Sequence, residues 1–375
     1  MIIPASVRDL IARGPLAHLT TINPNGSPQV TVVWVGIEDD EFVCAICSSN
    51  KGRSTMPYTL VPFTQDYLEP AVELFIESYK NEQEHSPLLP SRVIDEPTWI
   101  RGVLQSKLAN PGVVVVEQDR VLAYMVTGDQ FQWKGQQAAI IPEYGHSAIV
   151  TQKQELYQRM YMSLAQEWVN KQIHLHLIRH FAHDAILQET LYQLGFGAIL
   201  AERLRDCSAV AERQDVAINI EQDVSRLLTL QTEHNRYYPK APIFIQKSTE
   251  KQEVLAELEA HAQQGDVIFV YAEQHEPCAY MIVGTSTIGG EGCLLEQTNT
   301  AQIKSAYARP EIRGKGIGMA LLQRAIEWSH QQGYERLFVE HETANVYGGN
   351  FWRTYFTPYV YASMRYIDTT LDIPG

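Results

Sequence analysis

The chain has few features that would associate it with a membrane or an oxidising compartment. It has only five cysteines in 375 residues, and their odd number and scattered positions are typical of a reducing environment. No apolar run approaches the roughly 18 residues that a membrane-spanning helix needs, and residues 1–4 open no secretory signal. We therefore expect a cytoplasmic protein without a membrane partner.

Positive charge is scarce as well. Thirty Lys and Arg residues stand against 44 Asp and Glu residues, which gives a formal net charge of −14. Such a surface repels the phosphates of nucleic acids and anionic lipids, so nucleic acid is not an expected partner. An acidic surface attracts a cationic amine, although it also serves plain solubility.

Nothing in the sequence predicts a metal site. Cys44 and Cys47 have CxxC spacing, but residues three apart on a strand face opposite sides, and no second Cys or His pair lies nearby. Four histidines cluster further along the chain, at His174, His176, His180 and His183. The first two share a strand face and could bind a metal with Asp184, but ordinary hydrogen bonds are the commoner role for such histidines.

Hydrophobic periodicity divides the chain into three segments, 1–55, 56–207 and 208–375. In the first, we expect a helix at 7–13 and strands at 17–22, 29–36 and 41–47. In the second, we expect strands at 59–62, 113–117, 121–126, 138–141 and 173–181, helices at 66–79, 154–170 and 186–194, and an irregular Pro-containing stretch after residue 79. In the third, we expect helices at 221–234, 252–263, 319–331 and 350–355 and strands at 267–272, 278–283, 303–308 and 337–341. The repeated order predicts an α+β protein with two tandem copies of one unit, a first copy (56–207) and a second copy (208–375), after a small β-rich N-terminal segment.

The most informative motif is Arg-Gly-Lys-Gly-Ile-Gly at residues 313–318, between a predicted strand and a predicted helix. Glycines there let backbone N–H groups approach a ligand, and a helix N-terminus favours an anion such as a pyrophosphate. A Walker loop is excluded because Lys315 precedes Gly316, and a dinucleotide fingerprint because Met319 follows Gly318. A glycine-rich turn without a ligand remains an alternative.

Residues 307–318 resemble the acetyl-CoA signature of the GNAT acetyltransferase superfamily. The resemblance implies two tandem GNAT-like mixed-sheet domains with flanking helices, and acetyl-CoA as co-substrate. It implies that Ala306, Tyr307 and Ala308 pair with the pantetheine arm, which enters between two splayed strands. The implied pyrophosphate cradle comprises Arg313, Gly314, Lys315, Gly316, Ile317, Gly318 and Met319, with Arg313 bonding the cradle or capping the turn instead of touching phosphate. Asn345 contacts the arm or, alternatively, caps a helix.

Two residues are candidates for catalysis. The resemblance implies that Glu340 helps to deprotonate the amine, and Glu342 shares its strand face; a solvated strand end explains both carboxylates as well. The family usually has a Tyr seven residues after the Asn as the acid for the leaving thiolate, but Trp352 stands there. Tyr355, one helical turn on, is our candidate acid, ahead of Tyr347 and Tyr359.

The first copy departs further from the signature. Its residues 191–196 resemble the closing helix and turn, with Tyr192 in the acid position, but Ala185 stands where Asn is expected. Residues 149–156 contain no glycine, and a turn that carries side chains does not present the same cradle. We therefore expect the first copy to be degenerate, so that it does not bind acetyl-CoA but braces the second copy or shapes its acceptor cleft.

Residues 14–21 and 27–30 resemble the start of the split-barrel flavin family related to pyridoxamine phosphate oxidases, and Lys51 and Arg53 resemble its phosphate-contacting pair. About 55 residues are too few to close such a barrel, so a truncated remnant without flavin is expected.

The sequence thus favours an acetyl-CoA-dependent N-acetyltransferase that acts on a small-molecule or peptide amine by direct acyl transfer. One alternative is a non-catalytic acyl-CoA-binding or regulatory module, which the Trp352 replacement supports. Another is a flavin-dependent oxidoreductase remnant in residues 1–55.

Overall fold

The computed structural model describes residues 16–22, 28–38, 41–45, 58–129, 131–210, 216–289 and 292–371. The chain divides into two compact units, 1–57 and 58–375. In the first unit, an antiparallel sheet of order β1-β2-β3 confirms the three expected strands: β1 (Leu16–Ile22), β2 (Pro28–Glu38) and β3 (Glu41–Ala45). The expected helix at 7–13 and the residues Cys47, Lys51 and Arg53 lie outside the described residues.

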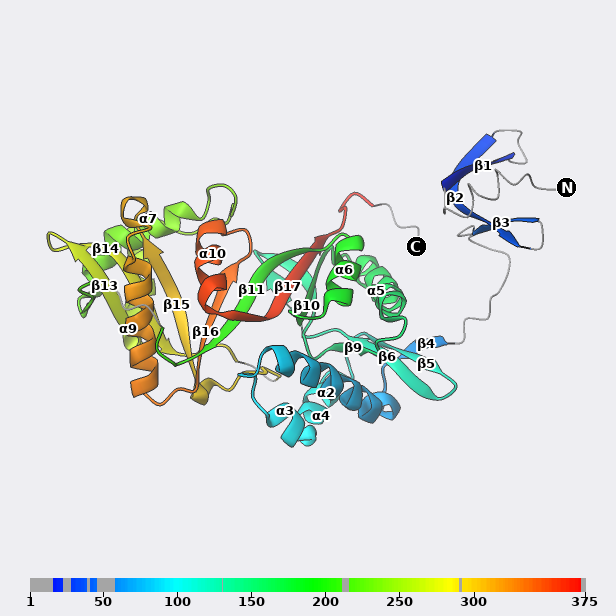
Figure 1. The fold of residues 1–375 in the computed structure, drawn as a ribbon, viewed down its shortest axis with the longest axis horizontal. Helices are drawn as coiled ribbons and strands as arrows, with labels where there is room; N and C mark the ends of the chain where they lie inside the picture. Colours follow the sequence, from blue (N-terminus) through cyan, green and yellow to red (C-terminus); the bar gives the residue numbers. More distant parts are fainter. Residues whose placement is uncertain are drawn as a thin grey trace. The chain divides into compact units, whose positions relative to one another are not determined.

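The second unit contains the two copies, which repeat one order of elements (Figure 1). The first copy comprises β4 (Thr59–Pro62), α2 (Leu68–His85), α3 (Arg92–Asp95), α4 (Pro97–Gln105), β5 (Gly112–Glu117), β6 (Arg120–Val126), β7 (Phe131–Trp133), β8 (Gln136–Ile141), β9 (His146–Ala148), α5 (Lys153–Asn170), β10 (Leu175–Phe181), α6 (Ala185–Gln193) and β11 (Gly197–Asp206). The second comprises β12 (Asn219–Ile220), α7 (Leu228–Tyr237), α8 (Lys251–Gln263), β13 (Val267–Glu273), β14 (Glu276–Thr285), β15 (Thr300–Ala308), α9 (Ile317–Gln331), β16 (Arg336–Glu342), α10 (Val346–Tyr355) and β17 (Thr357–Tyr366).

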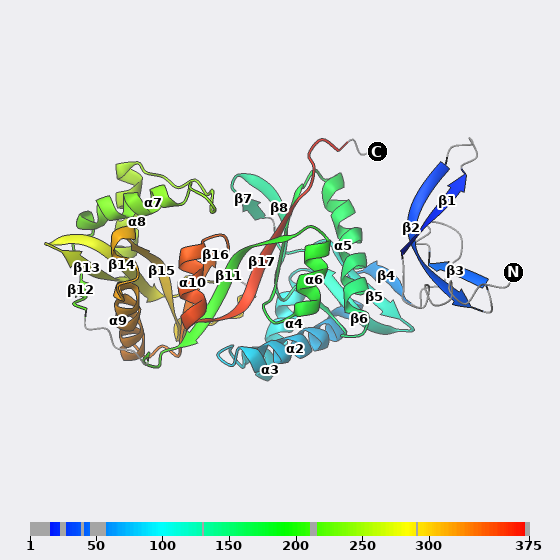
Figure 2. The ribbon, with the colours of Figure 1, turned by 45° about the horizontal axis from the view of Figure 1, so that its top comes forward.

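The two copies exchange their last strands. A ten-stranded sheet has the order β12-β13-β14-β15-β16-β11-β17-β10-β8-β7, and a four-stranded sheet has the order β4-β5-β6-β9. Strand β11 of the first copy pairs with β16 of the second, and β17 of the second pairs with β10 of the first. Figures 1 and 2 both show β11 (green) and β17 (red) side by side through the middle of this unit.

Helices cover both faces of each copy. In the first copy, α5 and α6 pack on one face of the strands, and α2 and α4 pack on the other. In the second copy, α9 and α10 cover one face while α7 and α8 cover the other. Leu294, Leu295, Phe338 and Tyr359 of the second copy join the core under α2 and α4, so the two copies share buried apolar contacts. No helix in the described part of the chain has the length and apolar character needed to cross a membrane.

Two expectations about the elements were wrong. The stretch after residue 79 is irregular only in part: residues 86–91 form no helix, but α2 extends to His85, and α3 and α4 follow. Pro97 stands in the first turn of α4, where the missing N–H of a proline would have no partner in the helix anyway. The sequence also failed to predict strands β7, β9, β11, β12 and β17. Strand β11 buries the charged Glu202 and Arg203 at its centre, which conceals the apolar pattern of a core strand.

Candidate active site

Strands β15 and β16 separate at one end. They pair in parallel from Thr300 with Arg336 to Ile303 with Val339, but β15 continues to Ala308 without a partner on that side. A register shift between β14 and β15 opposite Ile282 bends β15 where the separation begins. The resemblance implied this splayed gap, and the described strands contain it.

The backbone of Ala308 faces the gap. On the other side of β15, the amide of Arg309 donates to the carbonyl of Cys278 at 3.0 Å. Because neighbouring residues of an antiparallel ladder point their N–H and C=O groups in opposite directions, those of Ala306 and Ala308 point away from β14. Ala306 and Ala308 therefore direct main-chain groups into the gap, as predicted. Tyr307 does not, because its main-chain groups face β14.

The glycine motif forms the turn between β15 and α9. Gly314 has φ +77° and Gly316, the N-cap residue of α9, has φ +80°. A Cβ at Gly314 would meet no atom within 4 Å, so the backbone conformation and not crowding favours glycine there. Within the described chain, none of the six amide groups of residues 314–319 donates a well-formed hydrogen bond to another protein group. Six free donors at a helix N-terminus form a site for an anion.

The other side chains of the motif fix the turn. Ile317 and Met319 are buried in the core beneath α9, so only their backbone amides are available to a ligand. A Cβ at Gly318 would stand 3.3 Å from the Phe351 ring, which shows how closely α9 approaches α10. Lys315 is exposed and leaves a positive charge at the open side of the turn.

Arg313 ties this turn to the end of β15. Its Nε donates to the Ala308 carbonyl at 2.9 Å, and its guanidinium lies 5.5–5.7 Å from three aromatic ring centres, those of Tyr237, Tyr307 and Tyr347. This geometry matches the capping role that the sequence left open for Arg313.

Asn345 caps α10. Its Oδ1 accepts hydrogen bonds from the Gly348 amide and from the Tyr237 hydroxyl, both at 3.1 Å. The bond from Gly348 is the helix cap that the sequence offered as an alternative role for Asn345. The bond from Tyr237 holds Asn345 beside the ring that Arg313 contacts. Contact with a pantetheine arm stays a prediction.

Glu340 lies in β16 beyond the last residue that pairs with β15. Its side chain reaches solvent, yet it stands among densely placed protein atoms. The pKa of Glu340 is raised to about 7, first by desolvation and then by the carboxylates of Glu202 and Glu342, while the guanidinium of Arg179 opposes the rise. A carboxylate with a pKa near 7 is suited to general-base catalysis at neutral pH.

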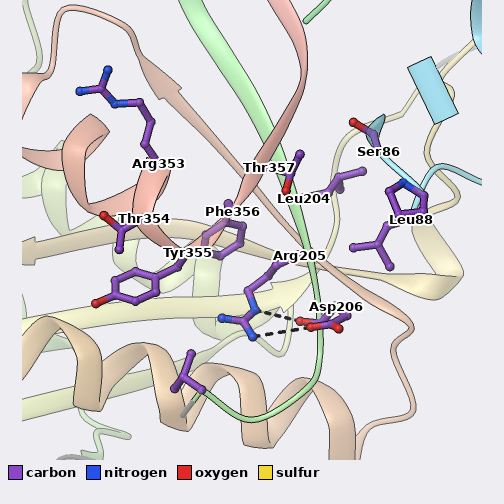
Figure 3. A pocket seen from close by; sticks show the side chains of 12 residues that line it. Ser86, Leu88, Leu204, Arg205, Asp206, Arg353, Thr354, Tyr355, Phe356 and Thr357 are labelled. Carbon is purple, nitrogen blue, oxygen red and sulfur yellow. Dashed lines mark hydrogen bonds and ion pairs between the residues drawn. The ribbon is translucent and has the colours of Figure 1, made fainter. Parts of the chain in front are cut away.

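The structure does not bring Tyr355 together with Glu340. Tyr355 ends α10 and lines a pocket of about 530 Å³ with Arg205, Asp206 and Arg353 (Figure 3). Asp206 pairs with Arg336 at the start of β16, whereas Glu340 lies four residues further along that strand. The two predicted catalytic residues therefore lie toward opposite ends of β16.

The other aromatic candidates differ in their exposure to solvent. Trp352 is buried against Phe356, and Tyr359 is buried and donates to Glu202. Tyr347 is exposed in the first turn of α10, beside Arg313. Of the tyrosines considered from the sequence, Tyr347 is thus the one that is exposed next to the glycine turn.

The comparisons with known proteins agree with this geometry. Residues 227–355 match the family model of the acetyltransferase (GNAT) family. This part of the chain is a GNAT acetyltransferase domain. Members of the family bind acetyl-CoA and transfer acyl groups in general. No curated protein sequence matches the chain.

One solved structure supports the fold of the two copies. A GCN5-related N-acetyltransferase from Sphaerobacter thermophilus superposes with a TM-score of 0.50 at 12% identity, over 85% of this chain and 98% of that one. A tandem GNAT protein from the clavulanic acid biosynthesis pathway gives a TM-score of 0.42 at 12% identity, over 82% and 98% of the two chains. At 12% identity the likeness to the Sphaerobacter thermophilus protein concerns the fold alone.

The first copy fills the places that stay open in the GNAT domain. Strands β8 and β9 together take the place of β15, since β8 pairs in parallel with β10 and β9 pairs with β6. His146 of β9 spans the gap, with Nε2 2.8 Å from the Arg179 carbonyl of β10. At the start of α5, the ammonium of Lys153 lies 2.5 Å from Asp184, the residue that caps α6.

One sequence assignment in the first copy is corrected by this geometry. Asp184, and not Ala185, corresponds to Asn345: each stands three residues after a strand, β10 or β16, and each caps the next helix through its side chain. Three of the four clustered histidines make side-chain hydrogen bonds: His176 with Tyr161, His180 with Ser363 and His183 with Glu82.

Sequence reasoning missed two residues near Glu340, namely Glu202 and Arg179. Glu202 is 1% exposed and directly opposes Glu340 across β11 and β16, and its Oε1 lies 2.6 Å from Arg179. The available signal was the pair of charged residues inside the apolar run 199–204, which indicates a buried ionic contact.

Proposed function

We propose that the chain is an acetyl-CoA-dependent N-acetyltransferase that acts on an amine. The observation that carries the proposal is the set of six amides at residues 314–319 that have no hydrogen-bond partner among the described residues, next to the gap between β15 and β16. The GNAT family match over residues 227–355 supports the same reaction class.

The residues of the gap fit acetyl-CoA, which supplies an activated thioester when bound. The amides of 314–319 and the exposed Lys315 would hold the pyrophosphate. The main-chain groups of Ala306, which point away from β14, would pair with a pantetheine amide, and the Ala308 amide would remain for the thioester. The first copy lacks this fit because Lys153 and Asp184 form an ion pair at the corresponding turn.

Glu340 would act as the base in the transfer. Its carboxylate accepts a proton from the attacking amine as the new C–N bond forms, and the C–S bond breaks with its electron pair going to sulfur. The Ala308 amide is in position to donate to the carbonyl oxygen as negative charge develops there. The sulfur then takes a proton from water or from Tyr347, the exposed tyrosine beside the glycine turn.

A thiol-release assay with acetyl-CoA and a panel of small-molecule and peptide amines tests this proposal. Turnover of at least one amine is expected, and Glu340→Gln should lower kcat by about 10²- to 10⁴-fold, the usual contribution of a general base, while acetyl-CoA still binds. Calorimetry measures that binding separately, with an expected stoichiometry of one.

The second candidate function is a non-catalytic acyl-CoA-binding module. The buried Trp352 at the usual acid position favours it. Binding with a stoichiometry of one, but with no thiol release on any amine of the panel, would support this alternative instead.

A further inference from the structure

A buried ionic network lies next to Glu340. Arg179 of β10 contacts two carboxylates, with Nε 2.7 Å from Glu143 and a terminal guanidinium nitrogen 2.6 Å from Glu202 of β11. The Tyr359 hydroxyl of β17 donates to the second oxygen of Glu202. Burial alone would lower the pKa of Arg179, but Glu143 and Glu202 outweigh it and hold that pKa above its usual value. Arg179 therefore stays charged.

Glu202 opposes Glu340 directly. The two residues are partners in the antiparallel register of β11 and β16, where facing Cβ atoms stand about 4.5–5.5 Å apart. Two carboxylates in that relation repel each other and destabilise the sheet unless a cation offsets them. Arg179 supplies that cation, from the far side of β11 and β17.

Three of these four charged residues come from the first copy. Glu143, Arg179 and Glu202 all belong to the first copy, whereas Glu340 belongs to the GNAT domain. Arg179 is the fifth residue of β10 and Glu340 the fifth residue of β16, so the two occupy corresponding positions in the two copies. The first copy thus has an arginine where the second has its candidate base, and the exchanged strand β11 connects them.

We propose that Arg179 and Glu202 of the first copy are positioning residues for the base of the second, with Arg179 neutralising Glu202 so that the facing Glu340 can work as a carboxylate. The inference rests on the proposed function. It gives the degenerate copy a definite task, which is to complete the catalytic site through an ion pair on its exchanged strand.

The arrangement has a consequence for the proton affinity of Glu340. The charged groups that act on its carboxylate are Glu202 on β11, Arg179 on β10 and Glu342 on its own strand, with Glu143 behind Arg179. Loss of Arg179 leaves Glu202 as an unbalanced like charge and raises the pKa of Glu340. Loss of the charge on Glu202 removes the repulsion and leaves Arg179 nearby, so it lowers that pKa.

The test is the acidic limb of kcat/KM against pH for the full chain. The wild-type limb should have its midpoint at about 7. Arg179→Met should move the midpoint up by about one unit and Glu202→Gln should move it down by about one unit. Arg179→Lys should restore a midpoint close to that of the wild type. Arg203→Met is the matched control, because it removes a buried arginine one residue from Glu202 on the opposite face of β11, where it contacts His341; its midpoint should not move.

A direct titration separates this inference from the proposed function. The ¹³C chemical shift of the Glu340 carboxyl carbon, assigned with Glu340→Gln, reports its protonation without any turnover. Opposite displacements in Arg179→Met and Glu202→Gln support the coupling even if no amine is acetylated. If Arg179→Met does not fold, the isosteric Glu202→Gln decides alone: an unchanged or raised midpoint overturns the inference. Displacement in the same direction in both variants overturns it too, even with an active enzyme.

Discussion

The two copies differ most at the turn where a strand feeds a long helix. In the second copy, Gly316 has a left-handed backbone at the N-cap of α9, and the amides around it have no partner in the described chain. In the first copy, Gln152 has the same left-handed backbone at the N-cap of α5, with φ +61°. One backbone shape thus persists in both turns, while only the second copy has glycines there and only the first has an ion pair at the start of its helix.

In the first copy, side chains occupy the positions that correspond to the open turn and strand gap of the second copy. Lys153 and Asp184 place an ion pair between the N-termini of α5 and α6, and His146 spans the strand gap. His146 thereby satisfies a main-chain carbonyl in the gap, and the ion pair places two side chains where the second copy has a glycine turn. The comparison teaches that a tandem copy can keep its fold and lose its ligand through a few side chains, while its last strand still serves the neighbouring copy.

The largest effect is expected from a Glu side chain in the glycine turn of the second copy, compared with the same side chain in the turn of the first. Gly316→Glu puts a Cβ on a left-handed residue and a negative charge where the pyrophosphate would lie, so we expect acetyl-CoA affinity to fall by at least about 100-fold, or roughly 3 kcal/mol. Calorimetry measures the loss. Gln152→Glu in the first copy is the matched control, and its affinity should equal that of the wild type. Equal losses in both variants would contradict the assignment of a single cradle.

The comparison also shows how far the sequence could lead. The motif at 313–318 was sufficient to predict the strand, turn and helix around it, because glycine, proline and apolar spacing report local backbone shape. The repeated order of elements was sufficient to predict two tandem copies, since each copy buries its own helices on its own strands.

The exchange of β11 and β17 could not be predicted in the same way. Strand partners far apart in sequence are set by tertiary packing, and a buried charge such as Glu202 looks like a surface residue until Arg179 is seen beside it. For the same reason, Tyr355 was predicted as an acid from helical spacing alone, although β16 and α10 carry it toward the far end of the site.

An intermediate effect should distinguish the tyrosines of the two copies. Tyr347→Phe removes the exposed hydroxyl next to Arg313, and we expect kcat to fall by about tenfold, since a thiolate is a fair leaving group without a dedicated acid. Tyr355→Phe, and Tyr192→Phe on the exposed face of α6, should each change kcat by less than about twofold. Steady-state thiol release measures all three. A tenfold loss in Tyr355→Phe, with none in Tyr347→Phe, would restore the assignment made from the sequence.

The smallest expected effect is on thermal stability, which the ionised carboxylate of Glu340 lowers. Desolvation, followed by Glu202, raises the pKa of Glu340 from 4.5 to about 7, so the folded chain binds this proton more tightly than the unfolded chain does. The resulting stabilisation is complete below pH 4.5 and is lost as the pH rises through 7. Glu340→Gln should therefore raise Tm at pH 8 by about 1 °C, a small shift because the side chain is solvent-exposed, and leave it unchanged at pH 4.5. Differential scanning calorimetry at both pH values measures the difference, and an equal gain at both would show that the carboxylate is not strained by its surroundings.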